Sequence, residues 1–315
     1  VLPSSVQTIN GYAFDGCTAL GDITLPSSTV AVGAYAFRNT SMDGATFICK
    51  GNAVFDTWAL AESGFKTVQF LGNCDLSIDA VLAYAKVENL TIGEGTEVLG
   101  SNFASTDFGE TTPLTVSLPE SLKEIGDGAF SQREGLTEID LKNVEVIGED
   151  AFSYTGLREL LIPGTVKEVG AAFDSCRQLQ TIRVSEGVEA IGDEAFSFAG
   201  NGNGSEGEYV TYLTDEEYEK NKAYVYQEDE KAGFVNVYLP STLKRVGANV
   251  FYGAYVDGIY MEWCTSPDAL PSFDPTFVED KFAGIHQIYF TKETIDVYGD
   301  ELDAYFMNTN AKDCC

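Results

Sequence analysis

Histidine and basic residues are scarce in this sequence, and each shortage removes a class of function. The chain has 315 residues, with one histidine and 19 lysines and arginines against 49 aspartates and glutamates. A zinc site built from several histidines is therefore excluded, and a histidine-dependent nucleophile would have to use His286. We predict that His286 lies in a strand near the end of the chain, as a surface or packing residue. No catalytic residue, metal or cofactor is expected.

The sequence also lacks features that direct a chain to nucleic acid or into a membrane. The net charge of −30 repels phosphate backbones and anionic headgroups. No apolar run reaches the length of a membrane span, so no membrane insertion is expected. The chain has no signal peptide and begins inside a repeated phrase, which indicates a mature or trimmed fragment.

Seven cysteines are present and no two form a CxxC pair. Cys17 and Cys176 both stand three residues after a repeated phenylalanine, so we expect both at a small, buried position of the core. Cys49 and Cys74 could be near neighbours, but their registers in the repeat differ. We favour free thiols there and keep a disulfide as the alternative. Cys314 and Cys315, adjacent at the tail, are expected to be exposed.

One phrase recurs along the chain and predicts its architecture. The sequence "LKEIGDGAF" at 122–130 returns, with small changes, at 144–152, 166–173, 188–196 and 243–251, and more weakly at 6–14 and 29–37. Its glycine falls at 126, 148, 170 and 192, a constant spacing of 22 residues. A period between about 20 and 50 residues indicates stacked units, each of which needs a neighbour to cover its apolar face.

Each repeat has the pattern of two short strands followed by a turn. In "LTEIDL" at 136–141, apolar residues alternate with outward polar ones, as in a half-buried strand. "LKEI" at 122–125 is the second strand, and the glycine allows a sharp turn or a close backbone approach. The Ala-Phe pair then enters the core in a short helical turn. We expect an internal column that contains Phe130, Phe152, Phe173 and Phe196.

These phrases resemble the BspA-like leucine-rich repeats, with their pattern LTxIxLPxSVxxIGxxAFxxC. The resemblance is specific over about 114–200 and 234–252 and fair over 2–41. Over 42–86 the stretches "TWALAESGF" and "SIDAVLAYA" look helical instead, and 87–113 keeps only part of the pattern. From 253 the match fades toward a cap.

The resemblance implies one curved leucine-rich-repeat solenoid of mostly short β-strands. We assign 1–284 to the solenoid, with degenerate coils at 42–113, and 285–315 to a C-terminal capping segment. Such proteins are largely secreted or displayed on host-associated microbes, and some resemble adhesins. The resemblance implies a binding scaffold and does not specify a ligand. We predict non-covalent binding of a surface protein or glycan through the concave face and the tyrosine-rich C-terminal half, not catalysis.

Residues 201–233 interrupt the repeat. The step from Phe196 to Phe251 is 55 residues, one ordinary step plus an insertion of about 32 residues. The insertion holds nine acidic and three basic residues. Long insertions in a solenoid leave one face and often bind ligands, although a tolerated surface excursion is the alternative.

Tyrosine is concentrated in the same half, with twelve of the sixteen after residue 200. The outward position at the centre of each first strand is occupied, in order, by Thr24, Thr46, Gln69, Thr91, Ser117, Asp140, Leu161, Arg183, Tyr238, Tyr260 and Tyr289. Exposed aromatic residues supply rigid contact area for proteins or sugars. The predicted recognition surface therefore comprises Tyr238, Tyr260 and Tyr289 with Tyr209, Tyr212, Tyr224 and Tyr226 of the insertion.

Gly202, Gly204 and Gly207 spell GxGxxG, but they stand in an acidic segment and not between a strand and a helix, so we interpret them as a flexible loop.

Two functions other than ligand binding remain open from the sequence. With 49 carboxylates, a pair suited to glycosidase chemistry could arise, which leaves a polysaccharide-active enzyme as the rival. A passive stalk, without any exposed aromatic cluster, is the third reading.

Overall fold

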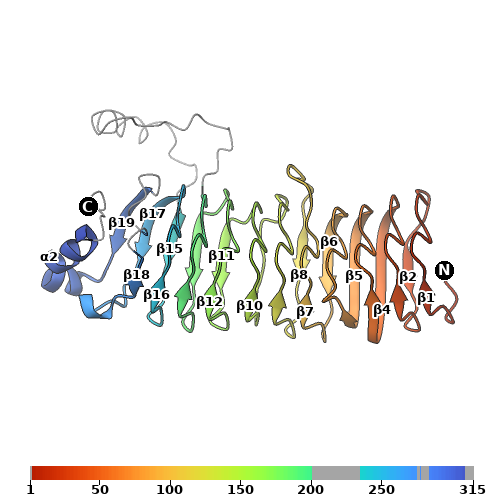
Figure 1. The fold of residues 1–315 in the computed structure, drawn as a ribbon, viewed down its shortest axis with the longest axis horizontal. Coiled ribbons are helices and arrows are strands. Elements are labelled where there is room, and N and C mark those ends of the chain that lie inside the picture. The colour runs from red at the N-terminus through yellow and green to blue at the C-terminus, as the bar shows by residue number, and fades with distance from the viewer. Residues whose placement is uncertain (1, 201–234, 275–276, 278–283, 309–315) are drawn as a thin grey trace.

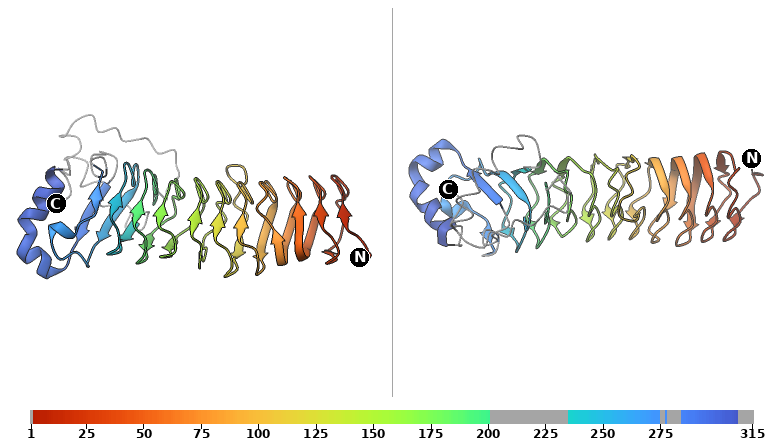
Figure 2. Two further views of the ribbon diagram at one scale, coloured as in Figure 1. Left: turned by 60° about the horizontal axis from the view of Figure 1, so that its bottom comes forward. Right: turned by 90° about the horizontal axis from the view of Figure 1, so that it is seen from above.

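The computed structural model describes residues 2–200, 235–274, 277 and 284–308. These residues form one elongated stack of coils that runs from the N-terminus at one end to a helix at the other (Figures 1 and 2). A solenoid of parallel strands is therefore confirmed. Of the described residues, no helix is both long and apolar enough to cross a membrane.

Two rows of strands run along the stack, and neighbouring strands pair in parallel in every case. The first row comprises β2 (Ile23–Leu25), β4 (Ser41–Phe55), β5 (Gly64–Asp75), β6 (Lys86–Ile92), β8 (Thr115–Ser117), β11 (Glu159–Ile162), β13 (Thr181–Val184), β15 (Val235–Tyr238), β17 (Tyr255–Tyr260) and β19 (Gly284–Tyr289). The second comprises β1 (Thr8–Ile9), β3 (Ala31–Val32), β7 (Val98–Leu99), β9 (Glu124–Ile125), β10 (Val146–Ile147), β12 (Glu168–Val169), β14 (Ala190–Ile191), β16 (Arg245–Val246) and β18 (Ser272–Phe273). The long strand β4 pairs with a strand of each row.

The third side of each coil is a double turn and not the short helical turn expected from the sequence. In the turn at 127–132, Gly128 and Gln132 both have left-handed backbone, with φ of 61° and 65°. A residue in this conformation ends a helix, so the peptide groups bond to the neighbouring coil instead. The amides of Phe130 and Gln132, for example, donate to the carbonyls of Ala151 and Ser153 at 2.8 and 2.7 Å.

The expectation of helices in the degenerate coils is wrong for the same reason. Residues 57–62 and 79–84 form turns. Each contains two left-handed residues, Trp58 and Glu62 in the first and Ala80 and Tyr84 in the second. The helical elements with described bounds are the 3₁₀ turn η1 (Pro267–Ala269) and the α-helix α2 (Lys292–Asn308), both near the C-terminal end.

The phenylalanine column predicted inside the coils is confirmed. Phe130, Phe152, Phe173 and Phe196 are each 0% exposed, and successive rings stack with centroids 5.3 to 5.8 Å apart. Phe251 continues the column at 5.8 Å from Phe196. The coils on either side of 201–234 are therefore direct neighbours, as the pairing of β13 with β15 also requires.

The degenerate coils keep a packed core with different residues. Leu60 and Leu82 are fully buried in the turns that lack the Ala-Phe pair. Phe47 and Phe70, which come from strands β4 and β5, stack at 5.2 Å and fill the adjoining space. The aromatic volume has moved from the turn to the strand, which explains how the repeat phrase is lost without loss of the stack.

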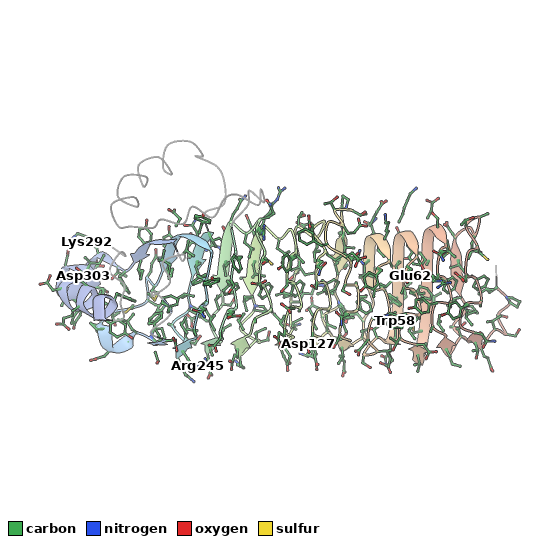
Figure 3. The ribbon with its side chains drawn as sticks, turned by 45° about the horizontal axis from the view of Figure 1, so that its top comes forward. Trp58, Glu62, Asp127, Arg245, Lys292 and Asp303 are labelled. Atoms are coloured by element: carbon green, nitrogen blue, oxygen red, sulfur yellow. A yellow bond between two sulfur atoms is a disulfide. The ribbon has the colours of Figure 1, made fainter. Side chains whose placement is uncertain are left out.

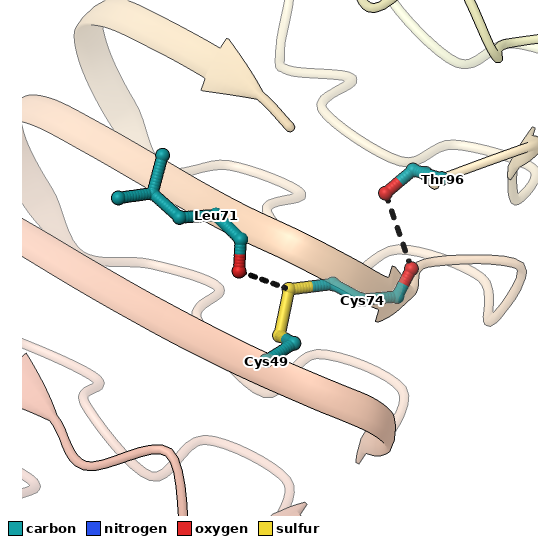
Figure 4. The surroundings of a disulfide bond; sticks show 4 residues. All are labelled: Cys49, Leu71, Cys74 and Thr96. Atoms are coloured by element: carbon teal, nitrogen blue, oxygen red, sulfur yellow. Dashed lines mark hydrogen bonds between the residues drawn. A yellow bond between two sulfur atoms is a disulfide. The ribbon is translucent and has the colours of Figure 1, made fainter. Parts of the chain in front are cut away.

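A disulfide joins Cys49 of β4 to Cys74 of β5, so the preference for free thiols was wrong (Figure 4). Cys49 lies opposite Gly72, but the pairing shifts between Cys49 and Ala53, and Gly72 has a φ of 82°. This irregularity brings the cysteine Cα atoms to 5.1 Å despite the difference in register. The hydroxyl of Thr96 in the next coil donates to the Cys74 carbonyl at 3.2 Å.

The two cysteines expected in one core position have different environments. Cys176 is fully buried, and burial raises the pKa of its thiol to about 12. Cys17 is exposed, contrary to expectation, because it belongs to the first coil, where no described coil covers one side. Cys314 and Cys315 lie outside the described residues.

The C-terminal end of the stack is covered by β19 and α2. The hydroxyl of Thr294 in α2 donates to the carbonyl of Cys264 at 2.7 Å. Phe306 of the same helix meets Phe273 of β18 edge-on at 5.8 Å. The division into a solenoid to residue 284 and a cap from 285 stays a prediction, since β19 itself pairs with β17.

Candidate functional site

The outward row predicted from the sequence exists along the first row of strands. Register pairs join the row members of neighbouring coils from Thr24 to Ser117 and again from Leu161 to Tyr289. The three tyrosines at its C-terminal end are half-buried. Their neighbours on the inner face of the same strands, such as Val237 and Ile259, are fully buried. Strand alternation therefore positions the row.

Four of these side chains form a continuous stack, which we call the tyrosine ladder (Arg183, Tyr238, Tyr260 and Tyr289). The Arg183 guanidinium lies 3.9 Å from the centre of the Tyr238 ring. Tyr238 and Tyr260 are 4.5 Å apart with 12° between their planes, and Tyr260 and Tyr289 are 4.5 Å apart with 7°. The spacing of parallel strands, about 4.8 Å, sets this distance.

A glycine beneath the ladder gives the rings their room. The Cβ of any larger residue at 258 would lie 2.7 Å from the Tyr289 ring and 3.0 Å from the Tyr260 ring. Gly258 is two residues before Tyr260 and hence on the same face of β17. The two aromatic rings therefore lean across the glycine and cover its backbone.

The ladder presents ring edges and hydroxyl groups to a ligand. Each face of the Tyr260 ring is covered by a neighbouring tyrosine, and one face of Tyr238 is covered by Arg183. The Tyr260 hydroxyl donates to Asn236 Oδ1 at 3.3 Å. Burial, reinforced by the neighbouring Tyr289 and Tyr238, raises the pKa of Tyr260, so its hydroxyl stays a hydrogen-bond donor at neutral pH.

Several predicted residues lie outside the part that is described. Four of these residues are the insertion tyrosines Tyr209, Tyr212, Tyr224 and Tyr226. The three glycines of the GxGxxG stretch also lie outside the described residues. Their proximity to the ladder stays a prediction. His286 lies in β19, as expected. Among the described residues, no group of three or more histidine, cysteine or acidic side chains is placed to hold a metal ion.

The sequence reading missed a second group of aromatic residues in the first three coils. Tyr12, Tyr35 and Trp58 stack in succession, with ring centroids 5.4 Å apart at each step. A signal was present: "GYAF" and "AYAF" place tyrosine two residues before the repeated phenylalanine, where "DGAF", "EDAF" and "DEAF" have glycine or an acid. These tyrosines were not predicted as a group, because the prediction rested on the residues that the copies share and not on those that differ.

The family match agrees with the parallel stack and its phenylalanine column. The model of the BspA type leucine rich repeat region matches residues 1–107 and 102–202 and counts six copies. Together these ranges exceed half of the chain. The chain belongs to this family. Its membership in the BspA type confirms the resemblance read from the repeated phrase.

Solved structures similar to this BspA-type chain are bacterial leucine-rich repeat proteins. One from Bacteroides ovatus has 17% identity and a TM-score of 0.36, covering 93% of this chain and 84% of its own. A leucine rich cell surface protein from Faecalibacterium prausnitzii has 15% sequence identity and a TM-score of 0.33, and the match covers 92% of this chain and 85% of that protein. The pneumococcal vaccine antigen PcpA has 14% sequence identity and a TM-score of 0.40, and the match covers 91% of this chain and 82% of that protein. A search of curated proteins finds no match.

Proposed function

We propose that this chain is an exported recognition module that binds a protein on a host or microbial surface, without chemistry, through the tyrosine ladder. The observation that carries the proposal is the ladder itself, a rigid row of three tyrosines and an arginine on the outer face of strands β13, β15, β17 and β19. Tyrosine and arginine are enriched among the residues that dominate binding energy at protein interfaces. Their stacking fixes the side chains in advance, which lowers the entropic cost of binding.

Two further observations support the location and the scaffold role. The disulfide between Cys49 and Cys74 is of a kind that persists in oxidising, extracytoplasmic surroundings. BspA-type repeats build an extended surface from repeated coils, which suits display of a binding face. An exposed aromatic cluster also argues against a passive stalk.

The geometry favours a protein over a glycan as the ligand. A sugar ring stacks on an open aromatic face, and the faces within the ladder are occupied by the neighbouring rings. Hydroxyl groups and ring edges suit hydrogen bonds and side-chain packing across a protein interface. A glycan array probed beside a panel of extracellular-matrix proteins separates the two ligand classes.

The test replaces Tyr238, Tyr260 and Tyr289 together by threonine, the residue that the same row carries at 24, 46 and 91. Threonine suits a strand, so the sheet is retained. Binding to the protein found on the panel is expected to fall at least about tenfold, a loss of ~1.4 kcal/mol. The control is Leu161→Thr, which introduces the same residue at an exposed position of the same row, beside Arg183. Unchanged affinity of the triple variant would exclude the ladder from the binding site.

A separate variant tests the insertion. Replacement of 201–233 by a short Gly-Ser link is expected to leave the stack folded, because the coils at either side already pair directly. If the insertion contributes to the site, the affinity of this variant falls while its circular dichroism is retained. A folded variant with full affinity would leave the ladder as the site without the insertion.

A further inference from the structure

The second aromatic group, which we call the N-terminal aromatic row (Tyr12, Tyr35 and Trp58), is exposed on the turn side of the first three coils. Tyr12 and Trp58 are 52% and 42% exposed. The ring centroids are 5.4 Å apart, compared with 4.5 Å in the ladder, and the planes are tilted by 24° and 35°. The rings are therefore more offset, and more of each face is open to a ligand than in the ladder.

Backbone preference does not explain these aromatic residues. All three have left-handed backbone, with φ of 58°, 54° and 61°. Other coils fill the corresponding turn position with residues of smaller or polar side chain, namely Ala80, Asn102, Gly128, Asp150, Glu194 and Asn249. A bulky residue in this region costs about 1–3 kcal/mol, whereas a stacked aromatic pair returns about 0.5–1.5 kcal/mol. Stacking offsets only part of the cost, which points to a role beyond folding.

The row already receives one cation from its own chain. The Arg38 guanidinium lies 5.1 Å from the centre of the Tyr12 ring and 5.6 Å from that of Tyr35. Its Nε and Nη2 donate to the two carboxylate oxygens of Asp15 at 3.0 and 2.8 Å. An aromatic face combined with a carboxylate is thus the arrangement that holds a guanidinium at this surface.

The next ring along the row offers the same chemistry to solvent. Trp58 stacks on Tyr35, and tryptophan is the most favourable aromatic partner for a cation. Exposed Glu62 belongs to the same turn as Trp58, and its carbonyl accepts a hydrogen bond at 3.0 Å from the amide of Asn39, the residue after Arg38, which places it beside the row. Trp58 and Glu62 lie in the same part of the N-terminal half of the stack (Figure 3).

We propose that Trp58, Tyr35 and Glu62 form a docking site for arginine or lysine side chains of a basic partner protein. The site lies in the N-terminal coils, whereas the tyrosine ladder lies in the C-terminal ones, and neither depends on the other. A single cation–aromatic contact contributes about 0.5–2 kcal/mol, so the partner presents several cations in one segment. The net charge of −30 attracts such a segment over distance.

A basic protein fits these observations better than a sugar. A neutral sugar gains nothing from the charge of Glu62 and would bind with little dependence on salt. A basic segment is attracted both by Glu62 and by the net negative charge of the chain, and its affinity falls as ionic strength rises. Salt dependence and charge dependence of binding therefore distinguish the two ligands.

The test uses a fluorescein-labelled peptide of alternating glycine and arginine, with binding measured by anisotropy. The matched probe replaces each arginine by citrulline, which has nearly the same shape and no charge. Saturable binding of the arginine peptide is expected, weakened at least about tenfold between about 0.01 M and about 0.15 M NaCl. The citrulline peptide is expected not to bind. A neutral oligosaccharide competitor is expected not to displace the arginine peptide.

Variants locate the binding. Trp58→Asn places at 58 the residue found in the same conformation at 102 and 249, so the fold is retained while binding is expected to fall at least about tenfold. Glu62→Gln is expected to weaken binding about threefold to tenfold. Trp263→Phe, remote from the row, and the threonine variant of the ladder are the controls, and both are expected to retain full affinity. In the Trp263→Phe protein, Trp58 is the remaining tryptophan, so its fluorescence responds to the peptide.

Three results would overturn the proposal. Equal binding of the citrulline peptide would show that charge is not recognised. Equal binding by a folded Trp58→Asn protein would place the cation elsewhere on the acidic surface. Displacement of the peptide by the oligosaccharide, or no binding at low salt, would exclude a basic protein as the occupant. None of these results bears on the ladder, which is tested by its own ligand and variants.

Discussion

Glycines at the same position of successive repeats face different environments. At 148 an added Cβ would meet Asp127 Oδ1 and would lie 2.6 Å from the carbonyl carbon of Gly126. At 170 the same atom would meet nothing within 4 Å. Neither glycine has left-handed backbone, so the close approach of neighbouring coils, not φ, is what requires glycine at 148.

Gly148→Ala and Gly170→Ala are therefore expected to have opposite effects. The first is expected to lower the free energy of unfolding by about 1–3 kcal/mol, because the methyl group forces two coils apart. The second is expected to be neutral or to stabilise by up to about 1 kcal/mol, because alanine restricts the unfolded chain. Urea denaturation of the pair measures the difference. Equal effects would contradict the inferred closeness of the coils at 148.

Arg133 is the one charged side chain among the largest fully buried residues of the described chain. Its Nε and Nη2 donate to the carbonyls of Ala104 and Ala85 at 2.5 and 2.8 Å, which joins its coil to two others. Burial lowers the pKa of the guanidinium to about 10, so it remains a cation at neutral pH. Its charge is held by carbonyl groups, with Glu110 acting from farther away.

We expect Arg133→Met to lower the free energy of unfolding by about 2–4 kcal/mol. Methionine fills part of the volume but leaves two buried carbonyl oxygens without a donor. Arg245→Met is the control, because Arg245 forms an exposed ion pair with Glu168 and is expected to contribute less than about 1 kcal/mol. Denaturation midpoints that are equal for the two variants would show that the carbonyl contacts of Arg133 contribute little.

At the scale of elements, the disulfide reinforces the coils whose repeat pattern is weakest. Cys49 and Cys74 are separated by 25 residues, and β4 and β5 otherwise pair along most of their length. Closing a loop of this length in the unfolded chain corresponds to about 3.5 kcal/mol. The double variant Cys49→Ala/Cys74→Ala is expected to lose about 2–4 kcal/mol of stability.

Chemical denaturation with and without reductant tests the role of this disulfide. Reductant is expected to shift the wild-type midpoint to that of the double variant and to leave the variant itself unchanged. A wild-type protein insensitive to reductant under denaturing conditions would contradict the cross-link.

Elements set by repetition were predictable from the sequence, and elements set by irregular backbone were not. Alternation and a fixed period gave both strands, the phenylalanine column and the register of the row that ends at Tyr289. The turns were mistaken for helix because left-handed residues such as Gln132 and Tyr84 carry no composition signal. The disulfide was missed because the shift between Cys49 and Ala53 breaks the register on which the reading depended.

The same distinction applies to the sites. Tyr238, Tyr260 and Tyr289 were found because they share one position of the repeat, while the stacking of their rings and the contact of Arg183 with Tyr238 were visible only in the structure. The N-terminal aromatic row was missed because its significance lies in a departure from the repeat. In a solenoid, the shared residues describe the scaffold, and the departures from it indicate where binding has been added.

Across the whole molecule, two aromatic surfaces lie toward opposite ends of one rigid stack. The ladder projects from the first row of strands in the C-terminal coils, and the N-terminal aromatic row projects from the turn side of the first three coils. The continuous core between them fixes their separation. A partner that spans both would gain from effective concentration, whereas two small partners would bind independently.

The charge of the molecule leads to a last prediction about stability and salt. Eight ion pairs join described residues to one another, most with both side chains substantially exposed. Each exposed pair contributes about 0–1 kcal/mol and is weakened by salt. Against them stands a net charge of −30 on coils that lie about 5 Å apart, well within the screening length at any physiological salt. Repulsion among carboxylates therefore outweighs the attraction of the pairs.

We expect the melting temperature to rise by a few degrees as NaCl increases from about 0.01 M to about 0.15 M, where the Debye length falls from about 30 Å to about 8 Å. Calcium chloride at matched ionic strength serves as the control. Screening alone predicts nearly equal shifts in the two salts, and a larger shift in calcium would indicate specific binding to the acidic surface. A melting temperature that falls with NaCl would show that the ion pairs, such as Lys66–Asp43 and Lys244–Glu189, outweigh the net repulsion.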